Sequence, residues 1–128
     1  MATPLHALTS PRRNKLLAFL DGEDLARLEP SLQRVSLASQ QQLYDYRQNV
    51  SHIHFPLSGV VAIMRTLSDG DTAQVASVGN EGAVGYGALI DAPVASGRAI
   101  VQLPGDALRI EVSAIQSYAL DHPWFRAV

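Results

Sequence analysis

Cysteine is absent from this sequence of 128 residues. Its absence excludes disulfides, iron–sulfur clusters held by thiolates, thiol nucleophiles and zinc sites of the cysteine type. Long apolar runs are absent too, because no stretch approaches the roughly 20 residues that a membrane-spanning helix needs. The opening residues Met1 to His6 lack the basic start and apolar core of a signal peptide. We therefore expect a cytoplasmic protein that makes no contact with a membrane.

An excess of positive charge is also missing. Ten Lys and Arg residues face twelve Asp and Glu residues, which gives a formal net charge of −2 at pH 7. A domain that binds DNA by itself usually presents a basic face. The one basic cluster here, formed by Arg12, Arg13 and Lys15, has the pattern of a solvated helix face. If this protein acts on DNA, we expect another part of it to make the contact.

Short helices are predicted at both ends of a single folded domain, for which a hydrophobic content of 47% supplies one core. Ser10 can cap a first helix, and Asp21 can cap a second that Pro30 ends. Near the other end, Ser113 and Gln116 match a capping box. The predicted helical regions are about 11–29 and about 113–121.

The region between, about 33–112, is predicted to form short strands. Apolar residues alternate with polar ones in most of its segments, and Asp69-Gly70 lies between two of them as a hairpin turn. Such strands, separated by turn residues, indicate a sandwich, a barrel or a roll. The predicted strands lie around Val35–Leu37, Leu43–Tyr46, Ile53–Leu57, Val60–Met64, Thr72–Val78, Ala99–Leu103 and Leu108–Val112.

The order of these elements, with Phe-Pro-Leu-Ser-Gly-Val-Val at residues 55–61 and a glycine-rich turn at residues 79–87, resembles a known family. It is similar to the cyclic-nucleotide-binding domain in the sensor half of Crp/Fnr-type bacterial transcription regulators, over roughly Leu16 to Phe125. The resemblance implies a mostly β fold, a double-stranded β-helix or jelly-roll-like β-roll of roughly eight strands with short flanking α-helices. Residues 1–128 would form this single domain. A dimerisation helix and a helix-turn-helix domain are expected after residue 128.

The family also implies where a ligand would bind. After a glycine, a Glu holds the ribose hydroxyl, and an Arg with an adjacent Ser or Thr holds the phosphate about ten residues later, because a desolvated phosphate needs a cation and donors. Here Gly85 matches the glycine, but Tyr86 stands in the place of the Glu. Tyr86 either fills the vacated ribose site or stacks on another ligand. An ungapped count puts Ala95-Ser96-Gly97 where the Arg and its partner belong, with Arg98 slightly late.

We therefore expect the sensory domain of a regulator that does not bind cyclic AMP in the usual way. Its effector would be an unidentified small molecule, it would contact DNA only through the domain after residue 128, and the full-length protein would be a homodimer. We expect no enzyme activity, no catalytic or metal-binding residue and no cofactor. The candidate ligand-binding residues are Glu81, Gly85, Tyr86, Ser96 and Arg98.

Two other interpretations stay open. His52 and His54 are two positions apart on a predicted strand, so both face the same way, as in the His-x-His metal sites of cupin enzymes. Cupins add a nearby Glu and a further His, whereas Phe55 to Gly59 contain no Glu and the one later histidine is His122. The alternatives are thus a cupin-like metal-dependent enzyme that uses His52 and His54, or an interaction scaffold that binds no ligand.

Overall fold

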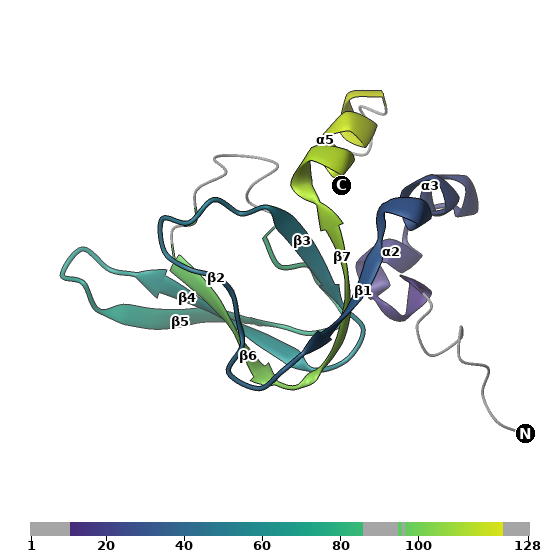
Figure 1. Cartoon of the computed structure of the whole chain (residues 1–128). Helices are drawn as coiled ribbons and strands as arrows, with labels where there is room; N and C mark the ends of the chain where they lie inside the picture. The colour runs from purple at the N-terminus through teal and green to yellow at the C-terminus, as the bar shows by residue number, and fades with distance from the viewer. Residues whose placement is uncertain (1–10, 86–94, 96, 122–128) are drawn as a thin grey trace, which may run out of the picture.

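Two antiparallel sheets form most of this computed structural model, which describes residues 11–85, 95 and 97–121 (Figure 1). One sheet has the strand order β1-β7-β3, and the other has the order β2-β6-β4-β5. The strands are β1 (Gln33–Leu37), β2 (Gln42–Tyr44), β3 (His52–Pro56), β4 (Val60–Thr66), β5 (Thr72–Val78), β6 (Gly97–Leu103) and β7 (Gly105–Glu111). The predicted mostly β, jelly-roll-like fold is confirmed. The described residues hold seven strands and one isolated bridge, His54 to Val84, where roughly eight strands were expected.

Short helices flank the sheets, as predicted. Before the first strand come η1 (Pro11–Arg13), α2 (Lys15–Ala18), α3 (Gly22–Leu28) and η2 (Glu29–Ser31), and after the last comes α5 (Val112–Asp121). Asp21 caps α3 as predicted, its carboxylate accepting from the Asp24 N–H at 2.9 Å. No helix in the described residues is long and apolar enough to cross a membrane.

The α-helices nearest to Ser10 and Ser113 are α2 and α5, which begin at Lys15 and Val112. The cap of α2 is Asn14, whose side chain accepts from the backbone N–H groups of the first helical turn, while Ser10 lies outside the described residues. The capping box at Ser113 is wrong, because α5 begins one residue earlier and Ser113 lies inside it. Its hydroxyl donates to a carboxylate oxygen of Glu111 at 3.5 Å instead.

Asn14 also fastens the first helices to the sheets. Its side chain is fully buried, and its amide nitrogen donates to the carbonyl oxygens of Pro56 and Gly82, both at 2.9 Å. Its amide oxygen accepts from the N–H groups of Leu16 and Leu17. Every hydrogen-bonding group of this buried amide therefore has a partner, which burial of a polar side chain requires.

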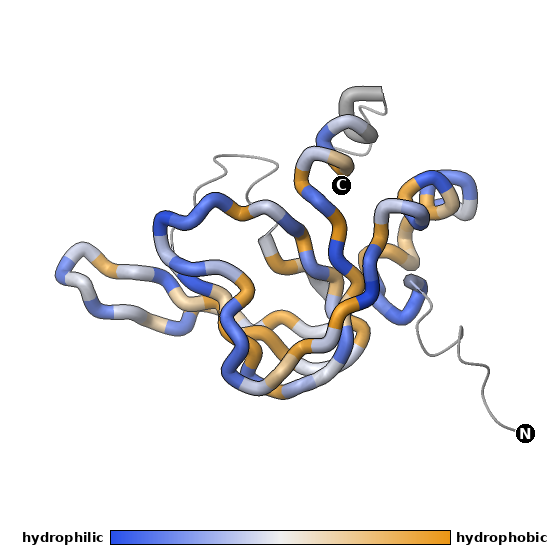
Figure 2. Tube along the Cα trace, viewed as in Figure 1, coloured by the Kyte–Doolittle hydropathy of each residue, from blue (hydrophilic) through white to orange (hydrophobic). Residues whose placement is uncertain are grey.

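The alternation of the strands divides the buried apolar residues into two clusters. On β3 and β7, Ile53, Phe55 and Ile110 pack with the buried leucines of α2 and α3 and with Ile115 of α5. The second cluster lies between the two sheets and is called the roll core here: Leu37, Val61, Val84, Ala99, Val101 and Ala107. Figure 2 shows hydrophobic residues concentrated in these regions, whereas the far end of the β4–β5 hairpin is mostly pale or blue.

Because side chains alternate along a strand, the intervening residues of β3 and β7 point away from the helices. On β3 these residues are His52 and His54, and on β7 they include Arg109. Antiparallel pairing sets His54 directly opposite Arg109, and Arg109 opposite Gln33 of β1. The fold thus places two imidazoles and a guanidinium on the face that turns toward the second sheet.

Candidate ligand site

Gly85 lies where the chain passes the start of β3. Its φ is +93°, a left-handed conformation that side chains disfavour. A Cβ at this position would come within 2.9 Å of the His52 carbonyl oxygen and 3.1 Å of a Val50 methyl group. Glycine is therefore required here for backbone reasons. Tyr86, which follows it, and Ser96 lie outside the described residues.

Gly97 begins β6 and is buried against the neighbouring strand. A Cβ on Gly97 would collide with the backbone carbonyl of Met64 on β4. Its alternate neighbours Ala99 and Val101 belong to the roll core, so Gly97 shares the inward face of β6. No side chain can project into the roll from this position.

Arg98 points the other way, because it is one position out of phase with the inward-facing residues of β6. Its Nε lies 3.6 Å from a carboxylate oxygen of Asp45 in the loop between β2 and β3, and the two side chains are 41% and 50% exposed. That loop is also tied to residue 95, since Arg47 N–H donates to the Ala95 carbonyl and Ala95 N–H to that of Gln48. Arg98 therefore helps to hold the loop against the start of β6.

Glu81 stabilises the turn after β5. One of its carboxylate oxygens accepts from the Gly79 N–H at 3.0 Å, and this hydrogen bond is the main reason that the pKa of the exposed Glu81 is lowered. The same turn meets the first helices, because the Lys15 N–H donates to the Asn80 carbonyl at 2.7 Å. Among the contacts of the described residues, none joins Glu81, Gly85 and Arg98 to one another.

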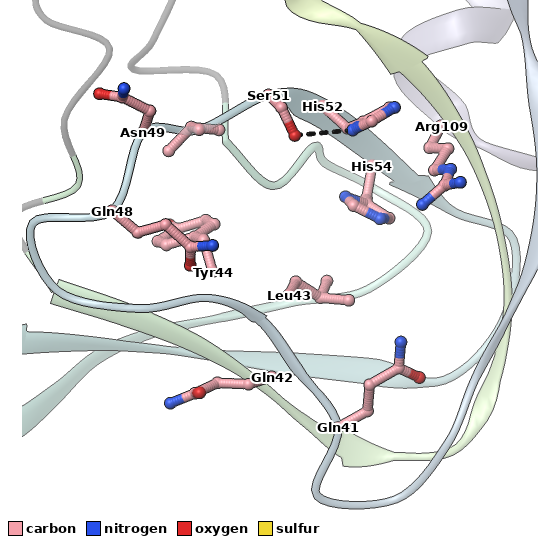
Figure 3. A pocket seen from close by; sticks show the side chains of 11 residues that line it. Gln41, Gln42, Leu43, Tyr44, Gln48, Asn49, Ser51, His52, His54 and Arg109 are labelled. Atoms are coloured by element: carbon pink, nitrogen blue, oxygen red, sulfur yellow. Dashed lines mark hydrogen bonds between the residues drawn. The ribbon is translucent and has the colours of Figure 1, made fainter.

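A different set of side chains surrounds a hollow of about 280 Å³ at the mouth of the roll (Figure 3). It lies between β2, the β2–β3 loop, β3 and β7. Most of its lining is neutral and polar, and His52, His54 and Arg109 close one side. The lining residues with amide or hydroxyl groups are Gln41, Gln42, Tyr44, Gln48, Asn49 and Ser51.

His54 is the most buried titratable group of this hollow, with only 7% of its surface exposed. Its Nδ1 is buried and has no hydrogen-bond partner among the described residues. Burial, then the positive charge of Arg109 and then His52, lower the pKa of His54 from 6.5 to about 4. The imidazole is therefore neutral at pH 7, with one N–H donor and one acceptor nitrogen.

The groups around His54 have separate roles. The Nε of Arg109 donates to the side-chain oxygen of Gln33 at 2.9 Å, and no carboxylate of the described residues forms an ion pair with it. Burial raises the pKa of the Tyr44 phenol, which keeps it protonated. His52 Nδ1 and the Ser51 hydroxyl form a hydrogen bond of 2.8 Å.

The sequence pointed only partly to this hollow. The His52-x-His54 spacing marked two of its residues, but as a candidate metal pair. The two imidazole centroids are 6.5 Å apart, and the described residues contain no group of three or more His, Asp or Glu side chains that could hold a metal ion. The sequence gives no signal for Arg109 beyond its place in the predicted strand Leu108–Val112, because it is the pairing of two distant strands that brings it beside His54.

Comparison with known proteins gives matches in structure only, since no protein-family model and no curated protein sequence matches the chain. The N-terminal domain of a transcriptional regulator from Streptomyces coelicolor A3(2) is 26% identical, with a TM-score of 0.70 over 91% of this chain and 81% of that one. A putative cyclic nucleotide binding protein from Ruegeria pomeroyi is 18% identical, with a TM-score of 0.78 over 94% and 54%. The c-di-GMP responsive global regulator CLP of Xanthomonas campestris is 15% identical, with a TM-score of 0.66 over 78% and 49%.

These similarities confirm the resemblance seen in the sequence. The chain has the cyclic-nucleotide-binding β-roll fold that occurs in Crp/Fnr-type transcription regulators, and the neighbours described above are regulatory or nucleotide-binding proteins. It spans about half the length of the second and third of them.

Proposed function

We propose that this β-roll is the sensory domain of a bacterial Crp/Fnr-type transcription regulator and that it does not bind cyclic AMP in the usual way. The observation that carries the second part is Gly97. By the ungapped count it is one of the three residues, Ala95 to Gly97, that replace the phosphate-binding residues of the family, and the backbone of β4 leaves no room for a side chain there.

Arg98, which follows Gly97 in the sequence, does not replace the arginine with which the family binds the phosphate. Arg98 lies on the outward face of β6 and is paired with Asp45, so a phosphate bound at the start of β6 would lack the charged partner that the family supplies there. A buried anion without a cation is costly, and losing such a partner typically weakens binding by about 2–5 kcal/mol. Glu81 cannot supply the ribose contact from its own turn, where it is bound to Gly79.

Regulation would follow from a coupled equilibrium. An effector that binds one arrangement of the roll more tightly than another shifts the population of the DNA-binding arrangement by the same free energy. In this proposal a dimerisation helix and a helix-turn-helix domain follow residue 128, and the full-length protein is a cytoplasmic homodimer. The similarity to the Streptomyces coelicolor regulator domain supports this assignment.

Thermal unfolding with added nucleotide tests the proposal. Cyclic AMP, cyclic GMP and c-di-GMP are each added at millimolar concentration to the 128-residue chain. A ligand at 100 times its dissociation constant would stabilise the domain by about 2.7 kcal/mol, a shift of several degrees. We expect no shift with either cyclic mononucleotide. A saturable shift with cyclic AMP would refute the loss of the usual site.

The reading frame beyond codon 128 tests the regulator assignment separately. We expect it to encode a long amphipathic helix followed by a helix-turn-helix. A continuation into an enzyme domain would contradict the assignment.

A further inference from the structure

We infer that the hollow between β2, β3 and β7 binds a small organic oxyanion, with Arg109 and His54 as its binding residues. The inference rests on the proposed sensory function for its biological role and deepens it by naming the class of effector. Of the five residues that the family resemblance singled out, the three that the structure describes, Glu81, Gly85 and Arg98, do not line this hollow.

An unsatisfied polar group points to a ligand. His54 is more than nine-tenths buried, its ring faces the hollow, and its buried Nδ1 has no partner among the described residues (Figure 3). Buried polar atoms in folded proteins nearly always have a hydrogen-bond partner. A ligand oxygen in the hollow would supply the partner that the described residues leave out.

The charge of the lining selects an anion. Among the described residues that line the hollow, Arg109 is the one permanently charged group, and no carboxylate lines it. The Nε of Arg109 is used by Gln33, which leaves the two terminal NH₂ groups to form the paired hydrogen bonds that suit a carboxylate or phosphate. Glu111 lines a second hollow, which shares His52 and Arg109 with the first, and its carboxylate accepts from the Ser113 hydroxyl at 3.5 Å.

The size and polarity of the hollow limit the ligand further. A volume of about 280 Å³ is just below the roughly 300–1,000 Å³ of typical small-molecule sites. This favours a compact molecule over a dinucleotide. The neutral Tyr44 phenol and the amides of Gln42 and Gln48 can bind the rest of such a molecule without adding charge.

The position of the hollow offers a route for a response. Gln48 and Asn49 of the β2–β3 loop line it, and Gln48 accepts from the N–H of Ala95, just before β6. A ligand that orders this loop would therefore act on the segment that leads into β6. In the family resemblance the phosphate-binding residues belong to that segment.

The experiment uses the 128-residue chain with succinate and inorganic phosphate as probes. Thermal unfolding measures binding, and NMR titration of the His54 ring, identified by the His54→Gln variant, measures its pKa. We expect at least one probe to raise the unfolding midpoint saturably. We also expect it to raise the pKa of His54, because a bound negative charge offsets that of Arg109.

Two charge-matched variants locate the site. Arg109→Gln should weaken binding of the effective probe at least tenfold, because it removes the charge-assisted hydrogen bonds. Arg34→Gln removes the same charge from β1, where Arg34 forms an exposed ion pair with Asp106 at 3.2 Å, and should leave binding unchanged.

The responses to the two probes identify the class of oxyanion or overturn the inference. A response to succinate alone assigns the site to carboxylates, and a response to phosphate alone assigns it to phosphoryl groups. No saturable response to either probe, or binding that survives Arg109→Gln, overturns the inference. If Arg109→Gln does not fold, an unchanged His54 pKa in the presence of the probes overturns it instead. Failure of the proposed function is seen separately, as a cyclic AMP shift that Arg109→Gln does not alter.

Discussion

Protonation of His54 is expected to destabilise the domain as the pH falls from 6.5 to 4. In the native state burial holds the pKa of His54 at about 4, whereas the ordinary value is 6.5. The unfolded chain therefore takes up this proton first, so the stabilisation is complete above pH 6.5 and is lost as the pH falls toward 4. At about 1.4 kcal/mol per pKa unit, the shift corresponds to about 3 kcal/mol. That is a large share of the roughly 5–15 kcal/mol that stabilises a typical domain.

Chemical denaturation at pH 7, 6, 5 and 4 measures this effect. His54→Gln keeps a polar side chain that does not titrate. Between pH 7 and 4, its free energy of unfolding should therefore fall by about 3 kcal/mol less than that of the wild type. His52→Gln is the matched control, because it replaces a half-buried histidine on the same strand face and removes only the smallest of the three causes that lower the pKa of His54. The surface carboxyls of Asp21 and Glu81 have lowered pKa values, and their contribution to the pH dependence is common to the wild type and both variants.

The test compares how the free energy of unfolding changes with pH in each protein. Its absolute value is not used, because any substitution at a buried position can lower stability equally at every pH. Equal losses for wild type and His54→Gln between pH 6.5 and 4 would show that His54 is not held neutral by burial.

Two further substitutions test the packing that positions the site, by chemical denaturation at pH 7. Asn14→Asp keeps the helix cap but sets a carboxylate against two buried carbonyl oxygens. It should lower the free energy of unfolding by about 4 kcal/mol. A loss below about 1 kcal/mol would contradict the role of Asn14 as the anchor of the first helices. Gly97→Ala should cost about 3 kcal/mol or more because its Cβ collides with the Met64 carbonyl. Gly22→Ala is the control and should be neutral or slightly stabilising. A Cβ on Gly22 would lie 3.9 Å from its nearest neighbouring atom, and this residue is in a helix, where alanine is favoured over glycine. Similar losses for the two glycine variants would mean that β6 and β4 are not held at this close distance.

Much of the fold follows from short-range patterns. The alternation of Ile53 and Phe55 with His52 and His54 predicts a strand with one buried face, and Asp69-Gly70 predicts the hairpin that β4 and β5 form. These patterns depend on the side-chain period of a strand and on the conformations that glycine allows, which are properties of neighbouring residues. Helix ends were less certain, because several nearby polar residues can serve as a cap.

The candidate site was predicted only in part for the same reason. Counting along the sequence matched Gly85 to the glycine of the family and predicted that Ala95-Ser96-Gly97 stand in place of the phosphate-binding residues. It could not show that Arg98 faces outward, since a difference of one residue reverses the face of a strand.

The sequence by itself determined the class of fold, because alternation and turn residues act locally. Only the tertiary structure decided which polar side chains meet inside it. His54 and Arg109 are far apart in the chain, and the antiparallel register of β3 and β7 sets them opposite each other beside the hollow. Asn14 likewise finds its partners on two distant segments, so its role as a buried anchor could not be seen before the chain was folded. Burial and the field of a neighbouring charge, which set the protonation of His54, exist only once these strands are paired.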